Sequence, residues 1–402
     1  MAVTAPDSVN GSRNFTATYV DTKDGRLARA GVVLRRRMEN GKNIWEVEIG
    51  NATRAADGGP AGPPEEILRL LTAPLLGREL VEIAQTRTRS NGDDVETAVL
   101  EGQHVITVVP EWKPKLPKPK RRSQPKKGAP ALDRLRAYLR EQVDELARHD
   151  PGARLDDDPE RIHRMRVATR RARSALRTAR PLVDREWAQG LRGELKWLGT
   201  ELATARDLDV LLASLAADAD ELGKPAATIV RQLEGERRRA QKRLVAALES
   251  PRYLALLGEL ERAADAPRVR RADARLDKLA RKDFGRLRRA VRALGKSPSD
   301  QALHDVRKRG KRARYSAELA GGKQAKRFVE AAKSFQDVVG EHQDAVVAEE
   351  RLTALVPRAK STEAVFAAGR LVERQQRRRR HARKSLPKAW KKLRRQGRKA
   401  WA

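Results

Sequence analysis

Residues 162–173 read IHRMRVATRRAR and residues 303–314 read LHDVRKRGKRAR, so one pattern occurs twice in the chain. In both stretches a histidine is followed by basic residues at offsets 3, 7, 8 and 10. An α-helix turns about 100° per residue, so offsets 0, 3, 7 and 10 fall within roughly 80° of one another. Each stretch therefore predicts a helix with one histidine and three cations on a single face. Because like charges on one face repel, the doubled arrangement indicates a site for a long, multiply charged anion.

The whole chain is strongly basic. It has 402 residues, with 87 lysines and arginines against 54 acidic residues, and a formal net charge of +33. A charge of this size indicates a polyanionic partner, which could be nucleic acid, an anionic membrane surface or inorganic polyphosphate. Aromatic residues make up only 4% of the chain. This scarcity argues against aromatic base-stacking platforms as the main mode of binding.

The chain contains no cysteine, which excludes disulfides, thiolate metal sites and cysteine nucleophiles. Residues 1–12 are polar and lack the apolar core of a signal peptide. No segment approaches the roughly 20 apolar residues that span a membrane. We therefore expect a cytoplasmic protein without a membrane span.

The N-terminal quarter of the chain predicts a small α+β region at residues 14–112. Residues 1–13 are predicted to be a disordered N-terminus, and residues 113–130, rich in lysine and proline, an extended linker. Alternating and β-branched runs predict the strands, and a Pro-Pro-Glu-Glu start predicts the helix. The expected elements are strands at 15–20, 32–37, 44–49, 80–84, 95–100 and 104–109 and a helix at 65–71.

Residues 131–395 predict a helical domain in two halves, about 131–265 and 270–395, followed by a basic tail at 396–402. The last helix, from residue 374, is expected to fray toward its end. Glycine and proline predict the boundaries between helices. These breaks are expected at 150–152, 180–181, 223–225, 250–251, 267, 297–298 and 321–322.

The repeat extends beyond the two histidine stretches. Residues 195–198 (LKWL) correspond to residues 332–335 (AKSF), and residues 206–210 (RDLDV) correspond to residues 343–347 (QDAVV). Two homologous half-domains of about four helices each are the simplest explanation of this duplication.

With these residues, the region 131–395 resembles the CHAD domain, the conserved histidine α-helical domain. The resemblance implies a mainly α fold of two pseudo-symmetric four-helix bundles whose basic faces meet in a central channel that binds inorganic polyphosphate. It also implies a non-enzymatic protein, because members of the family are binders. Some members associate with polyphosphate granules, so the resemblance implies that location as well.

Residues 14–112 are similar in part to the CYTH domain, a triphosphate tunnel that often precedes CHAD. The likeness rests on residues 19–22 (YVDT), 26–31 (RLARAG) and 33–37 (VLRRR), followed by a strand with a tryptophan. CYTH domains open with a Glu-x-Glu-x-Lys strand that supplies metal-binding carboxylates and a phosphate-binding lysine. Residues 1–18 contain neither glutamate nor lysine. We therefore expect a degenerate, partial CYTH-like region without a closed tunnel and without metal-dependent triphosphate hydrolysis.

The predicted polyphosphate-binding residues lie on the two repeated faces and on the helices that follow them. Arginine suits this ligand because its planar fork donates two parallel hydrogen bonds, whereas lysine supplies a point charge. The halves are not equivalent, since Glu318 occupies the place of Arg177. We predict no catalytic group, no metal site and no cofactor. The predicted set is His163, Arg166, Arg170, Arg173, Arg177, Lys196, Arg206, His304, Arg307, Lys311, Arg314 and Lys333.

The two histidines have two alternative roles. With a reference pKa near 6.5, a neighbouring polyanion would favour the protonated ring, which would then contact phosphate directly. The alternative is a ring that orients its helix through a hydrogen bond. No third ligand accompanies either histidine, so a metal site is not expected.

The acids near the repeat, Asp207, Asp209 and Asp344, are expected to hold basic side chains by salt bridges rather than to act in catalysis. Arg171 and Arg312, at offset 8, are expected to pair with these acids or to lie at the rim of the site. The basic stretches at 374–380 and 391–399 predict a solvated helix face, with a second anion contact as the alternative.

Two other functions stay open at this point. One is nucleic-acid or ribosome binding through the basic surface, although DNA readers place basic residues on an exposed, convex helix. The other is triphosphate hydrolysis by the N-terminal region, which the missing Glu-x-Glu-x-Lys strand argues against.

Overall fold

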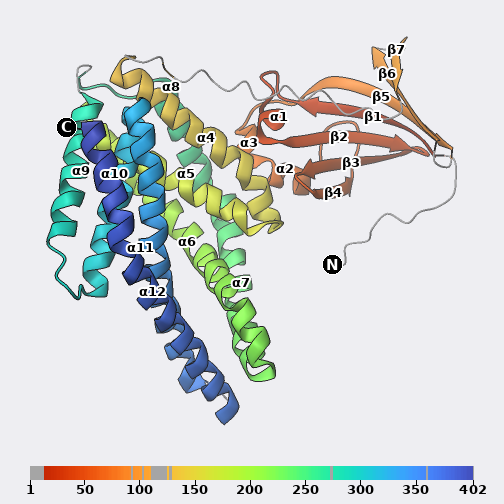
Figure 1. Ribbon diagram of the computed structural model, residues 1–402. Coiled ribbons are helices and arrows are strands. Elements are labelled where there is room, and N and C mark those ends of the chain that lie inside the picture. Colours follow the sequence, from red (N-terminus) through yellow and green to blue (C-terminus); the bar gives the residue numbers. More distant parts are fainter. Residues whose placement is uncertain are drawn as a thin grey trace. The chain divides into compact units, whose positions relative to one another are not determined.

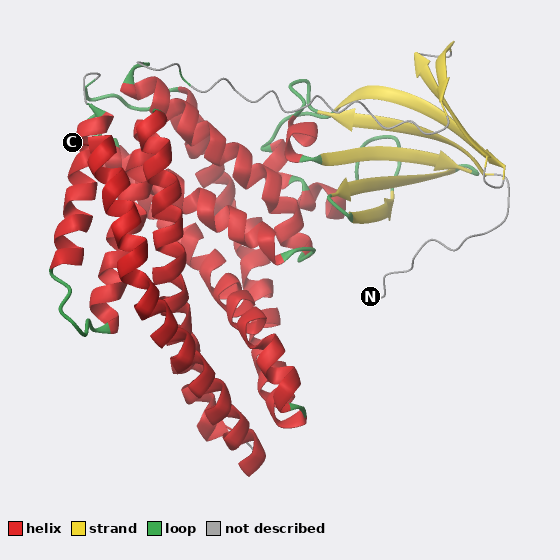
Figure 2. Cartoon of the chain, viewed as in Figure 1, coloured by secondary structure: helices red, strands yellow, loops and turns green. Residues whose placement is uncertain are grey.

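The structure is a computed structural model, and it describes residues 13–91, 94–101, 104–109, 125, 129–271, 275–358 and 361–401 (Figure 1). The predicted disordered N-terminus and most of the predicted linker lie outside these residues. The chain divides into two compact units, each described by itself below. One contains the N-terminal sheet together with residues 144–161 and 248–257, and the other contains residues 123–143, 162–247 and 258–402. Strands are confined to the first of these units in the described part of the chain (Figure 2).

The sheet of the first unit is antiparallel throughout, and β1 lies at its centre. The strand order is β4-β3-β2-β1-β5-β6-β7, which leaves β4 and β7 as edges among the described residues. Asn40 and Gly41, both with positive φ, form the tight turn between β2 and β3 that suits the twist of a hairpin. The six predicted strands are present, and β4 is an additional one. The bounds are β1 (Arg13–Asp21), β2 (Val32–Glu39), β3 (Lys42–Ile49), β4 (Ala52–Asp57), β5 (Val81–Asn91), β6 (Asp94–Glu101) and β7 (His104–Val109).

The two faces of this sheet have different chemistry because side chains alternate along each strand. Leu34 pairs with Val47 across β2 and β3 and is buried in an apolar cluster with Ile67. The neighbouring pair, Arg35 and Glu46, lies on the opposite face, where Arg35 Nε donates to Glu46 Oε2 at 2.7 Å. Three short helices contribute to the apolar side: α1 (Arg26–Ala30), α2 (Glu65–Leu70) and α3 (Thr72–Leu75). This small α+β region agrees with the expected partial CYTH-like fold.

The rest of the chain is helical. Gly223 and Gly321, with φ of 69° and 66°, end two of the helices, as the sequence predicts. Ser299 begins another, since its Oγ accepts from the backbone N–H of Ala302 at 3.2 Å. The helices are α4 (Ala131–Leu155), α5 (Pro159–Thr178), α6 (Arg185–Leu222), α7 (Lys224–Glu249), α8 (Pro251–Asp265), α9 (Leu276–Arg292), α10 (Asp300–Ala320), α11 (Lys323–Leu355) and α12 (Thr362–Trp401), with a short 3₁₀ turn at Val356–Arg358.

The predicted helix break at 150–152 is wrong, because α4 continues through Pro151 to Leu155. Asp150 and Arg154 lie one turn apart on either side of the proline, and both are buried. Arg154 Nε donates to Asp150 Oδ1 at 2.7 Å. Pro151 has no N–H to donate to the carbonyl of Ala147, and the buried ion pair supports the helix in the next turn, from Asp150 to Arg154.

The predicted fraying of the C-terminal tail is also wrong, because α12 continues to Trp401. Leu393 is fully buried in a cluster with Phe328 and Phe335. The ring centroids of Trp401 and Phe328 are 6.1 Å apart, and those of Trp390 and Phe335 are 5.8 Å apart. Burial of these aromatic side chains stabilises the helix against its own charge repulsion.

The repeated stretches form α5 and α10, and their apolar positions correspond. Ile162 and Met165 are buried in α5, as Leu303 and Val306 are in α10. Gly310 allows α10 to approach α11 closely, because a Cβ there would lie 3.3 Å from the Phe335 ring. None of the described helices is both long and apolar enough to cross a membrane.

Candidate functional site

The two motif helices, α5 and α10, pack against each other. Arg170 Nε donates to the hydroxyl of Tyr315 at 2.7 Å. Two turns further along α5, the hydroxyls of Thr178 and Ser316 lie 3.1 Å apart and are buried. The two halves of the helical domain therefore meet along the helices that carry the repeated cations.

A pair of equivalent ion pairs lies on these helices. Arg166 Nη1 lies 2.5 Å from Asp207 Oδ1, and Arg307 Nη2 lies 3.9 Å from Asp344 Oδ1. The first pair joins α5 to α6 and the second joins α10 to α11, at matching positions of the repeat. The predicted role of these two aspartates as partners of the basic side chains is confirmed. Asp209, the third acid, lies 2.5 Å from Arg237 of α7.

Lys311 lies at the centre of the cations from both halves. Burial, with the charges of Arg170, Arg307 and Arg166, lowers the pKa of Lys311 to about 6. Burial also lowers the pKa of Arg307, and the charges of Arg170 and Arg166 add to this effect. We call Arg166, Arg170, Arg307 and Lys311 the central cluster. It contains three arginines and a lysine against two partly exposed carboxylates, so without an anion its cations repel one another, most strongly when Lys311 is protonated.

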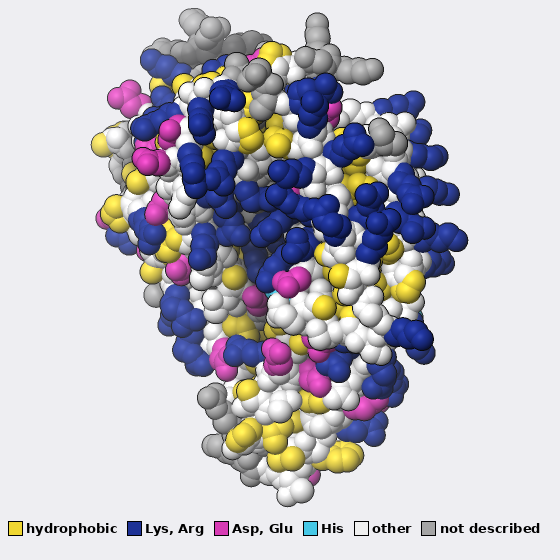
Figure 3. Space-filling model, turned by 90° about the vertical axis from the view of Figure 1, so that its left-hand side faces the viewer, with side chains coloured by type: hydrophobic (Ala, Val, Ile, Leu, Met, Phe, Trp, Pro, Cys, Tyr) yellow, Lys and Arg dark blue, Asp and Glu magenta, His cyan; other side chains and the backbone are white. Residues whose placement is uncertain are grey.

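One face of the molecule, the one drawn in Figure 3, is strongly basic. Lysine and arginine side chains gather across the middle of this face, and some of them lie within a hollow (Figure 3). Figure 3 also shows only a few acidic side chains beside them. A recessed group of cations suits a flexible, linear anion, whose non-bridging oxygens can meet several side chains in succession.

The next pair of predicted residues differs between the halves. Arg314 is held by Glu318, 3.3 Å away, and by the ring of Tyr315, 4.8 Å from its guanidinium. Its counterpart Arg173 has no acid or hydrogen-bond partner for its side chain in the described chain. Burial and the charges of Arg192 and Arg170 lower the pKa of Arg173.

Arg177 and Arg171 have acidic partners. Arg177 Nη2 lies 3.2 Å from Asp283 Oδ2 of α9. Arg171 Nε lies 3.3 Å from Glu318 Oε2 of α10, so the expected pairing of Arg171 with one of the repeat aspartates is wrong. Arg171 crosses to the other motif helix because α5 and α10 are direct neighbours.

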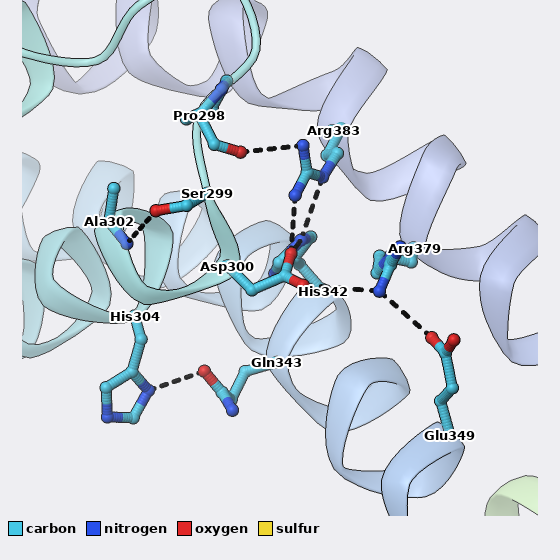
Figure 4. A network of polar contacts seen from close by, with 10 residues as sticks. All are labelled: Pro298, Ser299, Asp300, Ala302, His304, His342, Gln343, Glu349, Arg379 and Arg383. Atoms are coloured by element: carbon cyan, nitrogen blue, oxygen red, sulfur yellow. Dashed lines mark hydrogen bonds and ion pairs between the residues drawn. The ribbon is translucent and has the colours of Figure 1, made fainter. Parts of the chain in front are cut away.

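The histidine of the second motif is fixed by its neighbour. His304 Nδ1 lies 2.6 Å from Gln343 Oε1, which can only accept, so the ring donates at this nitrogen (Figure 4). Gln343 corresponds to Arg206 in the repeat, so His163 cannot make the same contact. His163 is half-buried and has a polar interaction of its own.

The three predicted residues on the helices that follow the motifs, α6 and α11, lie outside the central cluster. Lys333 is exposed and pairs with Glu330 at 2.8 Å. Lys196, its counterpart, is also exposed, and Arg206 is half-buried. Neither of these two side chains makes a hydrogen bond or an ion pair within the described residues.

The five arginines from Arg374 to Arg380 all contact acids, which corrects the prediction of a solvated face for this stretch, whereas the basic residues from Lys391 to Lys399 are exposed, as predicted. Arg374 and Arg378 both contact Asp218 of α6, at 2.9 and 3.1 Å. Arg379 and Arg383 converge on Asp300, at 3.3 and 2.5 Å (Figure 4). His342, buried beside Asp300 at 3.2 Å, belongs to the same network. Burial and the charge of Arg383 lower the pKa of His342.

Several contributors to the site were absent from the sequence prediction. Tyr315 lies at offset 11 from His304, about 20° from it around the helix, so it could have been placed on the same face. Arg192 lies one turn before Lys196, on the same face of α6. Within the residues that the structure describes, no group of three His, Asp or Glu side chains is placed to hold a metal ion.

Known proteins resemble the helical domain. The model of the CHAD domain matches residues 137–353. A protein of Mycobacterium tuberculosis described as uncharacterized, present in two strains, is 33% identical over 241 residues, which is 56% of this chain and 45% of the relative. The chain thus spans about half the length of these curated relatives.

Two solved structures are similar in fold and in sequence. PptA from Streptomyces chartreusis has a TM-score of 0.57 and 26% identity, over 65% of this chain and 100% of the other. The CHAD domain from the plant Ricinus communis has a TM-score of 0.53 and 27% identity, over 65% of this chain and 91% of the other.

Proposed function

Since the chain belongs to the CHAD domain family, we propose that its helical domain binds inorganic polyphosphate, without catalysis, at the central cluster of α5 and α10. The family is linked to polyphosphate-related proteins. One observation carries the proposal: Arg166 and Arg170 from one half meet Arg307 and Lys311 from the other, with too few acids to neutralise them.

The chemistry of the cluster fits a chain of phosphates. Each guanidinium can donate two parallel hydrogen bonds to non-bridging oxygens, and Lys311 can add a charge once it is protonated. The predicted residues Arg173 and Arg177 extend the cluster along α5, and His163 and His304 flank it on the same helix faces. Counterion release from the polymer should make binding strongly dependent on salt.

The aspartates Asp207 and Asp344 position the cations in this proposal. Each holds an arginine of the central cluster and leaves part of its guanidinium for an anion. A carboxylate in this position also limits the charge repulsion of the empty site. Both roles are structural, which agrees with a binding rather than a catalytic function.

A non-catalytic role extends to the N-terminal sheet. Glu46 is nearly buried and is contacted by Arg35 at 2.7 Å and by Arg37 at 3.3 Å. A carboxylate already paired with two arginines is a poor ligand for the metal ion that triphosphate hydrolysis requires. We infer that this face no longer supports such a reaction.

The test is a direct binding measurement on the full chain. Isothermal titration with long-chain polyphosphate should give saturable binding that weakens steeply with salt. Duplex DNA, added at equal phosphate concentration in moderate salt, should fail to displace it. Displacement by DNA would instead support the nucleic-acid alternative. Release of phosphate from tripolyphosphate with Mg²⁺ or Mn²⁺ would overturn the non-catalytic part.

The same proposal predicts a cellular location. A fluorescently tagged chain should concentrate at polyphosphate granules and should disperse in cells that cannot make the polymer. An R166Q/R307Q variant should stay dispersed in both cell types. Granule association of that variant equal to wild type would show that the central cluster is not the anchor.

A further inference from the structure

The repeat loses its symmetry beyond the central cluster. Arg177 of α5 corresponds to Glu318 of α10, and Arg192 of α6 corresponds to Val329 of α11. Val329 is buried in the apolar cluster of the second half. At both positions the first half carries a cation and the second half does not. The asymmetry therefore places positive charge at one end of the paired motif helices only.

Cross-helix contacts show how these positions meet. Arg171 reaches across to Glu318, the residue at offset 14 of the other motif. Arg312 is the counterpart of Arg171, so the pseudo-symmetry directs it toward offset 14 of the first motif, which is Arg177. Burial is the main cause of the lowered pKa of Arg177, and the charge of Arg312 lowers that pKa further, as this placement predicts.

Arg192 approaches the same place from α6. A short connection joins α5 and α6. Thr169 of α5 lies against Gly199 of α6, because a Cβ on Gly199 would be 3.6 Å from Cγ2 of Thr169. Leu176 lies two turns after Thr169 on α5, and Arg192 lies two turns before Gly199 on α6. Both steps lead toward the connection, so Arg192 lies beside this end of α5. Burial, followed by the charges of Arg180 and Arg312, lowers the pKa of Arg192.

Arg177 is paired with Asp283, but three other arginines at this end lack a protein partner among the described residues. The side chains of Arg173, Arg192 and Arg312 make no hydrogen bond or ion pair within the described part of the chain. Arg192 Nε is buried without a hydrogen-bond partner. Arg173 and Arg192 are partly buried, and donors that are buried without a partner beside like charges are costly unless an anion joins them.

The equivalent end of the second half is already neutralised. Glu318 lies 3.3 Å from both Arg171 and Arg314, and the hydroxyl of Tyr138 donates to it at 2.9 Å. An anion that extended in this direction would meet a carboxylate and occupied arginines. One end of the cluster is thus open to an anion and the other is closed.

We propose that Arg173, Arg192 and Arg312 form a second anion subsite, so that bound polyphosphate leaves the central cluster in one direction, along α5 toward residues 179–184. This inference rests on the proposed function and adds a direction to it. From Arg166 to Arg173 the helix rises roughly 10 Å, so we expect a short anion to stay mainly in the central cluster and a long chain to reach both places.

The test compares two ligands with two double variants of equal charge. R192Q/R312Q removes the second subsite, and R309Q/K326Q removes two exposed cations of α10 and α11 as a matched control. The first variant should weaken binding of long-chain polyphosphate about tenfold and change tripolyphosphate binding less than about twofold. The control should weaken both by less than about twofold.

Distinct results would overturn each claim. Equal losses of long-chain binding in the two double variants would mean diffuse attraction and no subsite. Equal losses of tripolyphosphate and long-chain binding in R192Q/R312Q would place these arginines in the central site. If wild type bound neither ligand, the proposed function itself would fail. R312Q alone changes an exposed residue, and its expected loss of about threefold tests the subsite should the double variant prove unstable.

Discussion

Helix α12 and the motif helices α5 and α10 are all rich in arginine, yet the network around Asp300 and the central cluster differ in how their cations are neutralised. On α12, Arg379 and Arg383 share Asp300. On α5 and α10, Arg173 has no acid partner and Lys311 lies among three arginines. The number of cations on a helix therefore does not locate a binding site in this protein. What distinguishes the central cluster is that four basic side chains from both halves share only two carboxylates, both of them partly exposed.

The difference has an energetic meaning. Ion pairs on α12 join it to α6, α10 and α11, so they contribute to the folded state. The closely spaced cations of the central cluster repel one another and so raise the free energy of the empty protein, and a bound anion would lower it again. Changes in the two regions should consequently affect different measurements.

The largest effect is expected in the central cluster. R166Q/R307Q removes two charged donors that a polyphosphate would contact, so affinity should fall roughly a hundredfold. Thermal unfolding should stay close to wild type, since Asp207 and Asp344 are more than half exposed and remain hydrated. Titration calorimetry and thermal unfolding on the same samples measure both quantities. A large loss of stability without a loss of affinity would reverse the roles assigned to the two regions.

The complementary change is R379Q/R383Q on α12, which removes the same charge. Asp300 then loses two partners and His342 loses a neighbour, so the free energy of unfolding should fall by about 1–2 kcal/mol, because Asp300 is partly exposed. Polyphosphate affinity should change less than about threefold after correction for the unfolded fraction. Urea unfolding checks the first value. An affinity loss as large as that of R166Q/R307Q would make α12 part of the binding surface.

A smaller effect is expected from K311M, which sharpens the contrast through pH. The pKa of Lys311 is about 6 in the folded protein, below its ordinary value of 10.5. Between about pH 6 and 10.5 Lys311 is therefore protonated in the unfolded chain but mostly neutral in the folded one. Wild-type stability should therefore rise with pH across this range. K311M should be more stable by about 1 kcal/mol near pH 6, with a smaller difference at pH 9.

Binding should show the opposite dependence on pH. A polyanion favours protonated Lys311, so wild-type affinity should increase as pH falls from 8 to 6, with uptake of up to one proton. In K311M the uptake should decrease. Calorimetry in buffers of different ionisation enthalpy measures it. Equal proton uptake in both proteins would assign the proton to His163 or His304 instead of Lys311.

Much of the fold could be predicted from the sequence because periodicity and helix breakers are local. The repeated offsets placed Arg166 and Arg307 on equivalent helix faces, and the matching Asp207 and Asp344 proved to be their partners. The pairing of Asp218 with Arg374 could not be predicted in this way, since it depends on how α6 packs against α12. Helical periodicity sorts side chains onto faces, but tertiary packing decides which faces meet.

The same limit explains what was missed in the site. Offset 11 places Tyr315 on the motif face, yet a tyrosine there does not by itself indicate an arginine from the other half. The contact with Arg170 exists because α5 and α10 are neighbours. Arg192 has no basic counterpart in the repeat, because Val329 occupies the equivalent position. A pattern of duplicated cations therefore does not indicate it.

The crowding of cations around Lys311 has a consequence for the lifetime of the protein. An unoccupied molecule opens more often than an occupied one, and proteases cleave the opened form in proportion to its population. Cellular turnover should therefore be faster when the polymer is scarce, so the abundance of this protein would follow the supply of its ligand without any change in its synthesis.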